Sequence, residues 1–388
     1  MKVVRTETHS KEIHLDLDIG FPTQMDAPGA PGLGIRKSLK QIFRSNFFTR
    51  LTNWEYWPFS LIYFPVSFYW IWLIIKARSL FFFTASNPSI EFGGMLGESK
   101  FDIFKIINPS LQPKTIFSPP DRPYEQILAT LRSTEMDFPL IAKPDVGERG
   151  WMVEKINNEL ELKKYLEYSK VNLLLQEYID LPVELGVFYY RFPNETKGTI
   201  SSVVYKQFLE VKGDGKSSLK ELILTNPRAK LQFDSLEQSH GDQFDYVPLK
   251  NEVIPLVPIG NHCRGTTFFS GNHLINEHMI SVFDNIAHKI DGFYFGRFDI
   301  RCESIEGLYQ GKNFKILELN GAGSEPSHIY HPGFPLSSAY SVIFHHLNVL
   351  YRISKMNKKR GIPYMSFIEG MKMLKKIRNY KKLQTSNP

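Results

Sequence analysis

Cysteine is scarce in this chain. Only Cys263 and Cys302 occur among its 388 residues, and they lie too far apart for a C-x-x-C motif. Two cysteines exclude a disulfide framework and give little support to a zinc site or a thiol nucleophile. We therefore expect a reducing compartment, which places the protein on the cytoplasmic side of any membrane that it meets.

Acidic residues are nearly absent from the C-terminal end. The predicted basic tail, residues 351–388, holds eleven Lys or Arg and one acid, Glu369. This end carries +10 of a total net charge of +7, so the other residues sum to −3 and show no nucleic-acid-binding signature. Apolar residues recur there at helical spacing beside three lysines: Phe367, Met371, Leu374 and Ile377 beside Lys372, Lys375 and Lys376. Two interpretations stay open, a terminal helix docked on its own protein and a basic amphipathic helix on an anionic membrane surface.

Charge is missing altogether from residues 57–75, which read WPFSLIYFPVSFYWIWLII. At about 1.5 Å per residue this length nearly matches a hydrocarbon core of about 30 Å, and the Trp and Tyr residues toward both ends suit a membrane interface. Pro58, Pro65 and a second apolar cluster at 80–83 argue against a full span. We expect the aromatic segment 54–78 either to insert into or lie on a membrane, or to form part of the core. The aromatic segment is not expected to be a cleaved signal peptide, because it begins some fifty residues into the chain. The preceding residues 1–53 are predicted to be a mobile leader.

Strand and helix patterns alternate along the rest of the chain, which predicts an α/β or α+β protein with several sheets. The expected strands are 79–85, 113–117, 138–144, 151–156, 172–179, 183–192, 199–208, 293–300 and 314–320. The expected helices are 101–107, 123–133, 157–169, 217–224 and 274–290.

Two of these strands carry acids where a buried strand would be apolar. Alternation puts Arg297 and Asp299 on one face of their strand, and Glu318 and Asn320 on one face of the next, together with Phe314 and Ile316. Burying such acceptors is costly unless something cationic sits among them, and Mg²⁺ prefers oxygen ligands. The pattern predicts a metal site between the two strands, although an exposed polar edge would explain either strand taken alone.

A lysine and two glycines form a second candidate site. Lys143 ends the apolar stretch PLIAK and precedes a turn with Gly147 and Gly150. Glycines allow close backbone approach and leave N–H groups free for anions, so the turn is a candidate phosphate site. The Walker A spacing is absent. A solvated strand end followed by a simple hairpin would explain the same residues.

Taken together, the motifs resemble a known family. Lys143 with its glycine turn, QEYIDLPVE, GRFD and LELN follow the order of the ATP-grasp superfamily, in particular the D-alanine–D-alanine ligase branch of carboxylate–amine ligases. The resemblance runs from about Thr84 to about Pro335. It implies an α/β (α+β) ATP-grasp fold with a small lid subdomain and a larger C-terminal catalytic subdomain, preceded by the aromatic segment. The implied boundaries are 79–137 for an N-terminal α/β subdomain, 138–206 for the lid and 207–350 for the catalytic subdomain.

The resemblance also implies roles for single residues. Phosphate contacts would come from Lys100, Lys143, Lys206 and the turn Gly147, Arg149 and Gly150. Contacts to the adenine side and to the ribose hydroxyl groups would come from Glu177 and Glu184. Arg297 would face an acyl phosphate. The implied cofactors are ATP and Mg²⁺ (or Mn²⁺), with the metal held by Asp299, Glu318 and Asn320.

The loop after Asn320, residues 321–332, lies where relatives bind substrate. Glu325 could recognise an amino group there, and His328 could act as a base near its ordinary pKa of about 6.5. A loop whose Ser and His residues only cap the following helix is the alternative interpretation.

The implied activity is an ATP-dependent ligase that activates a carboxylate as an acyl phosphate and joins it to an amine, releasing ADP and phosphate. Arg297, Lys206 and His328 would be its catalytic residues. Its partners would be a small-molecule carboxylate and amine, with no nucleic acid, a possible membrane surface and an open oligomeric state. Two alternatives remain: a kinase-like or thiol-directed ATP-grasp enzyme, and a membrane-associated nucleotide-binding protein without catalysis.

Overall fold

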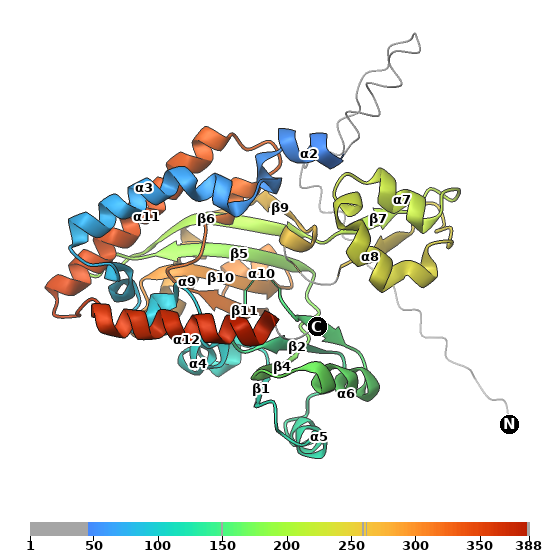
Figure 1. Cartoon of the computed structure of the whole chain (residues 1–388), viewed down its shortest axis with the longest axis horizontal. Helices are drawn as coiled ribbons and strands as arrows, with labels where there is room; N and C mark the ends of the chain where they lie inside the picture. The colour runs from blue at the N-terminus through green and yellow to red at the C-terminus, as the bar shows by residue number, and fades with distance from the viewer. Residues whose placement is uncertain (1–45, 149, 258–259, 261, 386–388) are drawn as a thin grey trace, which may run out of the picture. The chain divides into compact units, whose positions relative to one another are not determined.

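The computed structural model describes residues 46–148, 150–257, 260 and 262–385. Residues 1–45 of the predicted leader and the predicted phosphate contact Arg149 lie outside the described residues. The helices are α2 (Asn46–Thr52), α3 (Phe59–Ala77), α4 (Lys100–Ile106), α5 (Tyr124–Ser133), α6 (Glu159–Tyr168), α7 (Leu219–Thr225), α8 (Phe233–His240), α9 (Glu277–His288), α10 (Ile305–Tyr309), α11 (Leu336–Lys359) and α12 (Phe367–Thr385) (Figure 1). The strands are β1 (Thr115–Ser118), β2 (Leu140–Pro144), β3 (Glu154–Ile156), β4 (Leu173–Glu177), β5 (Val183–Tyr190), β6 (Thr199–Gln207), β7 (Glu210–Lys212), β8 (Val253–Pro255), β9 (Thr267–Ser270), β10 (Phe295–Cys302) and β11 (Phe314–Asn320).

These strands form antiparallel sheets, so the predicted α+β class is confirmed. A five-stranded sheet has the order β11-β10-β5-β6-β9, a four-stranded sheet has the order β1-β4-β2-β3, and β7 pairs with β8. Because successive side chains of a strand point to opposite faces, each strand of the larger sheet can serve a core on one side and a site on the other.

Hydrophobic clusters cover both faces of the five-stranded sheet. On one face, Val187, Val203 and Phe298 pack with Phe283 of α9. On the other face, Phe188 and Phe295 join a cluster with residues of α3, α11 and α12, including Leu73, Leu350 and Met373. The polar residues of the second face are therefore held on a strand scaffold that is rigidly packed from behind.

The four-stranded sheet has its own core with α5 and α6, centred on Leu140, Leu162 and Tyr165. The glycine turn, residues 145–153, connects β2 to β3. These elements differ from the predicted boundaries of the lid, 138–206. Strand β1 precedes that range and joins the small sheet, whereas β5 and β6 lie inside the range and belong to the large sheet.

The predicted strand at 79–85 is wrong. Residues Phe82–Ser86 form a 3-10 helix instead, and Phe81, Phe82 and Phe83 are all buried. Their rings pack in different directions, against Phe92, Trp70 and Tyr351 among others. A short apolar run fits either a strand or a helical turn when it is buried on every side, so periodicity could not separate the two.

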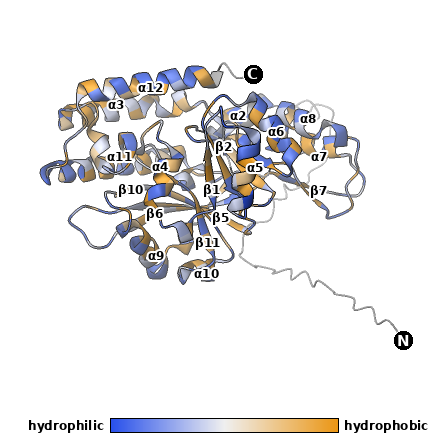
Figure 2. Ribbon diagram, turned by 90° about the horizontal axis from the view of Figure 1, so that it is seen from below, coloured by the Kyte–Doolittle hydropathy of each residue, from blue (hydrophilic) through white to orange (hydrophobic). Residues whose placement is uncertain are grey.

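Most of the aromatic segment forms the helix α3, which is long and apolar enough to cross a membrane, and few of its residues are buried in the protein. Residues 351–359 of the predicted basic tail belong to α11, and the tail then forms α12, in which hydrophilic and hydrophobic residues interleave (Figure 2). Met373 and Ile377 of α12 are buried in the cluster beneath α3 and α11. The helix is therefore docked on its own protein, but Phe367 and Met371, predicted to share a face with Ile377, are exposed.

Candidate functional site

A cavity of about 1170 Å³ separates the two larger sheets. Its walls come from the glycine turn, from the polar face of β5, β6, β10 and β11, and from α3 and α11. Twelve of the residues predicted for the site line it: Lys100, Lys143, Gly147, Gly150, Glu177, Glu184, Lys206, Arg297, Asp299, Glu318, Asn320 and Glu325. The structure thus brings together the phosphate, nucleotide and metal candidates that lie far apart in the sequence.

A β-bulge in β11 aims Glu318 and Asn320 into this cavity. Asp299 lies directly opposite Glu318 and Arg297 opposite Asn320, but Ile300 lies opposite Ile316, so one extra residue is inserted at Leu317. As a result Phe314, Ile316 and Leu319 all pack in the core behind the sheet. The prediction that Phe314 and Ile316 share the face of Glu318 is therefore wrong. Bulges re-aim side chains beside functional sites, and here the bulge keeps both the core and the acid face intact.

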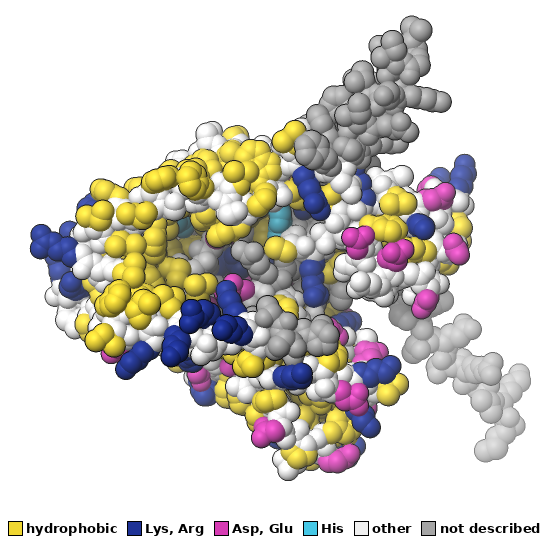
Figure 3. All heavy atoms as spheres, viewed as in Figure 1, with side chains coloured by type: hydrophobic (Ala, Val, Ile, Leu, Met, Phe, Trp, Pro, Cys, Tyr) yellow, Lys and Arg dark blue, Asp and Glu magenta, His cyan; other side chains and the backbone are white. Residues whose placement is uncertain are grey.

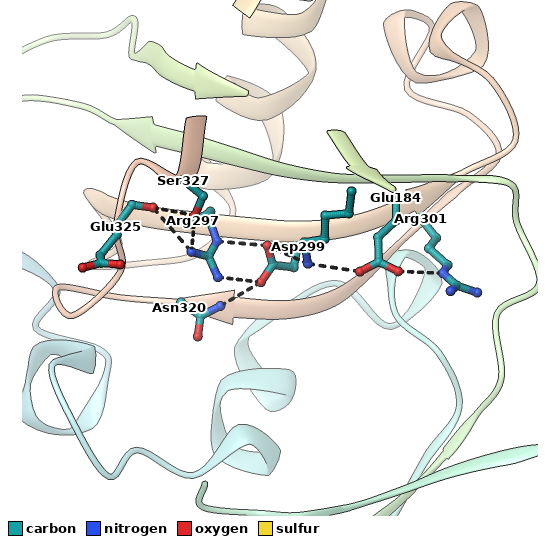
Figure 4. Close-up of polar contacts among 8 residues, drawn as sticks. Glu184, Arg297, Asp299, Arg301, Asn320, Glu325 and Ser327 are labelled. Carbon is teal, nitrogen blue, oxygen red and sulfur yellow. Dashed lines mark hydrogen bonds and ion pairs between the residues drawn. The ribbon is translucent and has the colours of Figure 1, made fainter. Parts of the chain in front are cut away.

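A chain of ion pairs crosses the floor of the cavity (Figure 4). Arg297 holds Asp299 with two hydrogen bonds, Nε to Oδ1 and Nη2 to Oδ2, both of 2.9 Å. Lys206 Nζ lies 3.5 Å from Asp299 Oδ1 and 3.0 Å from Glu184 Oε1, and Arg301 Nε donates to Glu184 Oε2 at 2.9 Å. Burial by itself would raise the pKa of Asp299, but Arg297 and Lys206 hold that pKa below its ordinary value. Asp299 is therefore an anion at neutral pH.

Asn320 extends this row of polar contacts toward Glu318. Its amide Nδ2 donates to Asp299 Oδ2 at 3.2 Å. Glu318 lies 3.7 Å from Lys100 Nζ and keeps 33% of its side chain exposed to the cavity. The carboxylate of Glu318 is the least engaged of the three candidate metal ligands.

Lys143 and Lys100 face the glycine turn. Lys143 Nζ donates to Gln176 Oε1 at 2.9 Å and to the Leu317 carbonyl at 3.4 Å, and it has no carboxylate partner among the described residues. Burial lowers the pKa of Lys143 to about 8. Lys100 Nζ donates to the Gly147 carbonyl at 2.6 Å. A buried ammonium group that neutral acceptors alone satisfy is a ready partner for an anionic ligand.

The two predicted nucleotide acids are placed differently. Glu177 lies at the cavity wall, where Oε2 accepts from the Lys114 amide at 3.1 Å. Glu184 is buried between Lys206 and Arg301, so its two oxygens are already occupied by cations. Its contact with a ribose remains a prediction, which the arrangement supports less well than the contact of Glu177.

The loop after β11 places its two candidates apart. Glu325 lines the cavity and accepts hydrogen bonds from the hydroxyl groups of Tyr63 and Tyr330. Burial raises the pKa of Glu325 to about 7. His328 is absent from the cavity lining, since it is buried against Ser202 with Nδ1 2.7 Å from the hydroxyl group. Burial lowers the pKa of His328 to about 4, so the predicted role of this residue as a base in the cavity is not supported.

Several site residues escaped the sequence analysis. Arg301 follows Arg297 and Asp299 at the same two-residue spacing, so alternation along β10 could have found it. Glu98, two residues before Lys100, lines the cavity, and burial raises its pKa. Tyr63 comes from the aromatic segment, and no local pattern in the sequence connects it to Glu325.

Comparison with known proteins gives a structural likeness only. No model of a known protein family matches the chain, and no curated protein matches it. Among solved structures it resembles a bifunctional glutathione synthetase from Pasteurella multocida, with 15% identity and a TM-score of 0.34 over 63% of this chain and 36% of that chain. It also resembles the VanG D-Ala:D-Ser ligase from Enterococcus faecalis, with 16% identity and a TM-score of 0.38 over 67% of this chain and 62% of that chain.

A third likeness is to a D-alanine–D-alanine ligase from Bacillus anthracis, with 12% identity and a TM-score of 0.37 over 68% of each chain. The chain therefore spans about a third of the glutathione synthetase and less than two thirds of the D-Ala:D-Ser ligase. The predicted likeness to D-alanine–D-alanine ligases is confirmed to this extent: structures with that name are among those that this chain resembles.

Proposed function

We propose that this protein is an ATP-grasp enzyme, an ATP-dependent ligase that joins a carboxylate to an amine. The observation that carries the proposal is the buried Lys143, which has no carboxylate partner among the described residues and lies beside Lys100 and the glycine turn. Asp299 and Glu318, paired across β10 and β11, come from the other sheet, and Glu318 lies 3.7 Å from Lys100 Nζ. The lysines can bind phosphate groups and the carboxylates can bind a metal ion, so the cavity suits a nucleoside triphosphate with its metal.

A divalent ion would be held by Asp299, Glu318 and Asn320. The types of donor suit Mg²⁺, since they are two carboxylates and an amide oxygen, and Glu318 keeps a third of its side chain free. Both oxygens of Asp299 accept hydrogen bonds from Arg297, so this pair would have to open for Asp299 to bind the ion. No cluster of three His, Cys, Asp or Glu residues suited to a metal occurs in the described part of the chain. Phosphate oxygens and water would therefore complete the shell, as is usual for Mg²⁺. When bound, the ion would neutralise charge on the terminal phosphates.

The chemistry follows from where the cations lie. An oxygen of the substrate carboxylate attacks the γ-phosphorus of ATP, the bond to the β-phosphate oxygen breaks, and ADP and an acyl phosphate form. Arg297, at the end of the cavity near Ser327 and Glu325, would stabilise the acyl phosphate. An amine then attacks the acyl carbon, phosphate leaves and an amide forms. Positioning and charge neutralisation provide most of the rate enhancement of a phosphoryl transfer, so this step does not require an activated Ser or Cys.

Glu325 is a candidate for the amine subsite. It lies beyond Arg297 as seen from the metal ligands, and its two tyrosine partners leave it able to accept from an ammonium group or to take up its proton. We also propose that the enzyme associates with a membrane, because α3 exposes large apolar side chains. The scarcity of cysteine suits the cytoplasmic side of that membrane.

The proposal is tested by measuring ADP and phosphate release across amino acids, short peptides and other small carboxylates, each with and without added amines. We expect turnover that requires Mg²⁺, requires both substrates, and disappears in Asp299→Ala/Glu318→Ala. A matched control is Asp234→Ala/Glu237→Ala, two exposed acids on α8, which should leave activity unchanged.

An isotope label then identifies the chemical step. With ¹⁸O in the substrate carboxylate, one labelled oxygen should appear in the released phosphate. Label in AMP would indicate adenylation instead. Label retained in a stable phosphorylated product, with no phosphate release, would indicate a kinase.

A further inference from the structure

The outer face of α3 is an apolar stripe that no described residue covers. Its members are exposed large hydrophobic residues at helical spacing: Leu61, Phe64, Phe68, Ile71, Trp72 and Ile75. Phe64 is 64% exposed and Ile75 is 69% exposed. Soluble proteins rarely leave so large a contiguous apolar patch in water, and such patches mark interaction surfaces.

The N-terminal half of α12 continues this patch. Gly370 packs directly on the ring of Phe81, which lies four residues beyond the end of α3, and a Cβ atom at Gly370 would meet that ring at 2.2 Å. This contact brings the start of α12 close to the end of α3 (Figure 1). Phe367, Ile368 and Met371 then point outward with 45% to 67% of each residue exposed. Figure 3 shows hydrophobic side chains gathered over α3 and over this part of α12.

Basic residues border the patch. Lys76 Nζ lies 4.3 Å from the centre of the Trp72 ring, and Arg78 follows it. Along α12, Lys372 and Lys375 are exposed next to Met371, and Figure 3 shows Lys and Arg side chains beside the hydrophobic ones. Lysines at the edge of an apolar surface can reach anionic lipid headgroups while their aliphatic stems and the apolar side chains enter the boundary of the acyl chains. Two copies of the chain meeting through this face would instead bring like charges together.

The inner face of α3 is tied to the protein. Tyr63 donates to Glu325, and the Ile62 carbonyl accepts from the Tyr340 hydroxyl group at 3.1 Å. Val66 and Leu73 are buried beside α11 residues such as Ile343 and Leu350. A helix that left this position to cross a bilayer would strip a cavity residue, Glu325, of one of its partners. The contacts therefore favour a helix that lies in the membrane plane while it still lines the cavity.

We propose that the outer face of α3 and the N-terminal half of α12 form one docking surface, on which the protein rests flat on an anionic lipid bilayer without spanning it. This inference deepens the membrane association proposed above and does not depend on the ligase chemistry. Because Ile62, Tyr63 and Val66 line the cavity from the other side of α3, docking would place the cavity directly behind the lipid surface.

The test is flotation of the full chain with vesicles of phosphatidylcholine, with and without phosphatidylglycerol. We expect binding to the anionic vesicles and at least tenfold weaker binding of Phe64→Ser/Phe68→Ser/Ile75→Ser. The matched control is Leu160→Ser/Leu249→Ser, two residues that are 63% and 73% exposed and lie outside the patch, and it should bind like the unmodified chain. Lys372→Glu/Lys375→Glu should lose the preference for anionic lipid, whereas Lys163→Glu/Lys164→Glu on α6 should keep it.

The orientation of α3 on the bilayer is tested by measuring how deep three of its positions lie in the lipid. A fluorophore is attached in turn at Leu61→Cys, Phe68→Cys and Ile75→Cys in a chain carrying Cys263→Ser, and is quenched by lipids labelled near the headgroup or at the chain end. Flat docking predicts the same shallow depth at all three positions. A deep Phe68 position between two shallow ones would indicate a span and overturn the proposal.

Two further results would also overturn it: equal vesicle binding of the Phe64, Phe68 and Ile75 variant, and a concentration-dependent dimer that this variant abolishes while vesicles are not bound. ADP release by the same variant without vesicles should stay unchanged, since none of the three residues lines the cavity. Failure of docking can therefore be distinguished from failure of the ligase proposal.

Discussion

Lys143 shows how a single residue prepares the site for an anion. Its ammonium group is buried, and its hydrogen-bond partners are an amide oxygen and a backbone carbonyl. Burial disfavours the charged form, so the pKa falls to about 8 and the charge is only partly retained above neutral pH. The contribution of this residue to ATP binding should therefore depend on pH.

We predict that ATP affinity falls as pH rises from 7 to 9, because Lys143 loses its proton in this range. Lys143→Met should weaken ATP binding at pH 7 by about 10-fold to 100-fold, the loss of one charge-assisted hydrogen bond. Lys143→Arg should keep part of the affinity and remove the decline above pH 8, since a guanidinium group stays charged. Calorimetric titration of ATP at pH 7, 8 and 9 measures the affinity of the unmodified chain and of the two variants. An identical decline in the arginine variant would show that another group titrates.

Glu325 makes the stability of the fold, rather than ATP binding, depend on pH. Burial raises its pKa from 4.5 in the unfolded chain to about 7 in the folded protein, so the folded state binds the proton more tightly. The stability that this proton contributes is complete below pH 4.5 and is lost as pH rises through 7. Glu325→Gln imitates the protonated form. At both pH 5 and pH 8 its free energy of unfolding should exceed that of the unmodified chain, by about 1 kcal/mol at the lower pH and about 3 kcal/mol at the higher. Urea denaturation at the two pH values measures the gain, and Glu237→Gln should show none.

Helices and strands were predictable where the hydrophobic residues follow a single helical or strand spacing. The strands β5, β6, β10 and β11 and the helices α5, α6 and α9 lie close to where the pattern puts them. Alternation also gives the shared face of Arg297 and Asp299 on β10 and that of Glu318 and Asn320 on β11. The bulge at Leu317 was not predictable, because an inserted residue leaves no mark of its own in an apolar run. The aromatic run at 81–83 failed for a related reason: burial on all sides removes the contrast between faces on which the pattern depends.

At this scale the packing of α12 can be tested through Gly370. A methyl group there would lie 2.2 Å to 2.4 Å from the ring of Phe81, which is buried and has no room to move away. We predict that Gly370→Ala lowers the free energy of unfolding by about 1–3 kcal/mol through overpacking, despite the higher helix propensity of alanine. Gly241→Ala, with nothing within 4 Å of the added atom, should change it by less than about 1 kcal/mol. Equal effects in thermal unfolding would contradict this packing.

On the scale of the whole described chain, the site exists only where separate parts meet. The phosphate cations come from α4 and the four-stranded sheet, the acids from the five-stranded sheet, and Tyr63 from the aromatic segment. Short motifs predicted the first two sets, since each is local. The contribution of α3 depends on tertiary packing across more than 200 residues, as the pair of Tyr63 and Glu325 illustrates, and no periodic pattern encodes it.

The C-terminal helix connects two of these parts. Its start packs on Phe81, while near its end Tyr380 packs against the core of the four-stranded sheet and Lys381 lies 3.8 Å from Glu148 in the glycine turn. We predict that ending the chain after Arg378 weakens ATP binding about 3-fold to 10-fold, because the turn loses this support, a loss of about 1 kcal/mol. Ending it after Leu383 keeps these contacts and should leave the affinity unchanged. Equilibrium titration of ATP compares the two chains.

The measurement that tests the central claim most directly is calorimetric titration of ATP, with and without Mg²⁺, into the unmodified chain, Lys143→Met and Asp299→Ala/Glu318→Ala. If facing cations and acids hold a metal–triphosphate complex, Mg²⁺ should strengthen binding to the unmodified chain at least tenfold. The acid variant should lose that gain while it still binds metal-free ATP, and Lys143→Met should bind weakly under both conditions. An equal Mg²⁺ effect in the unmodified chain and the acid variant would contradict the account.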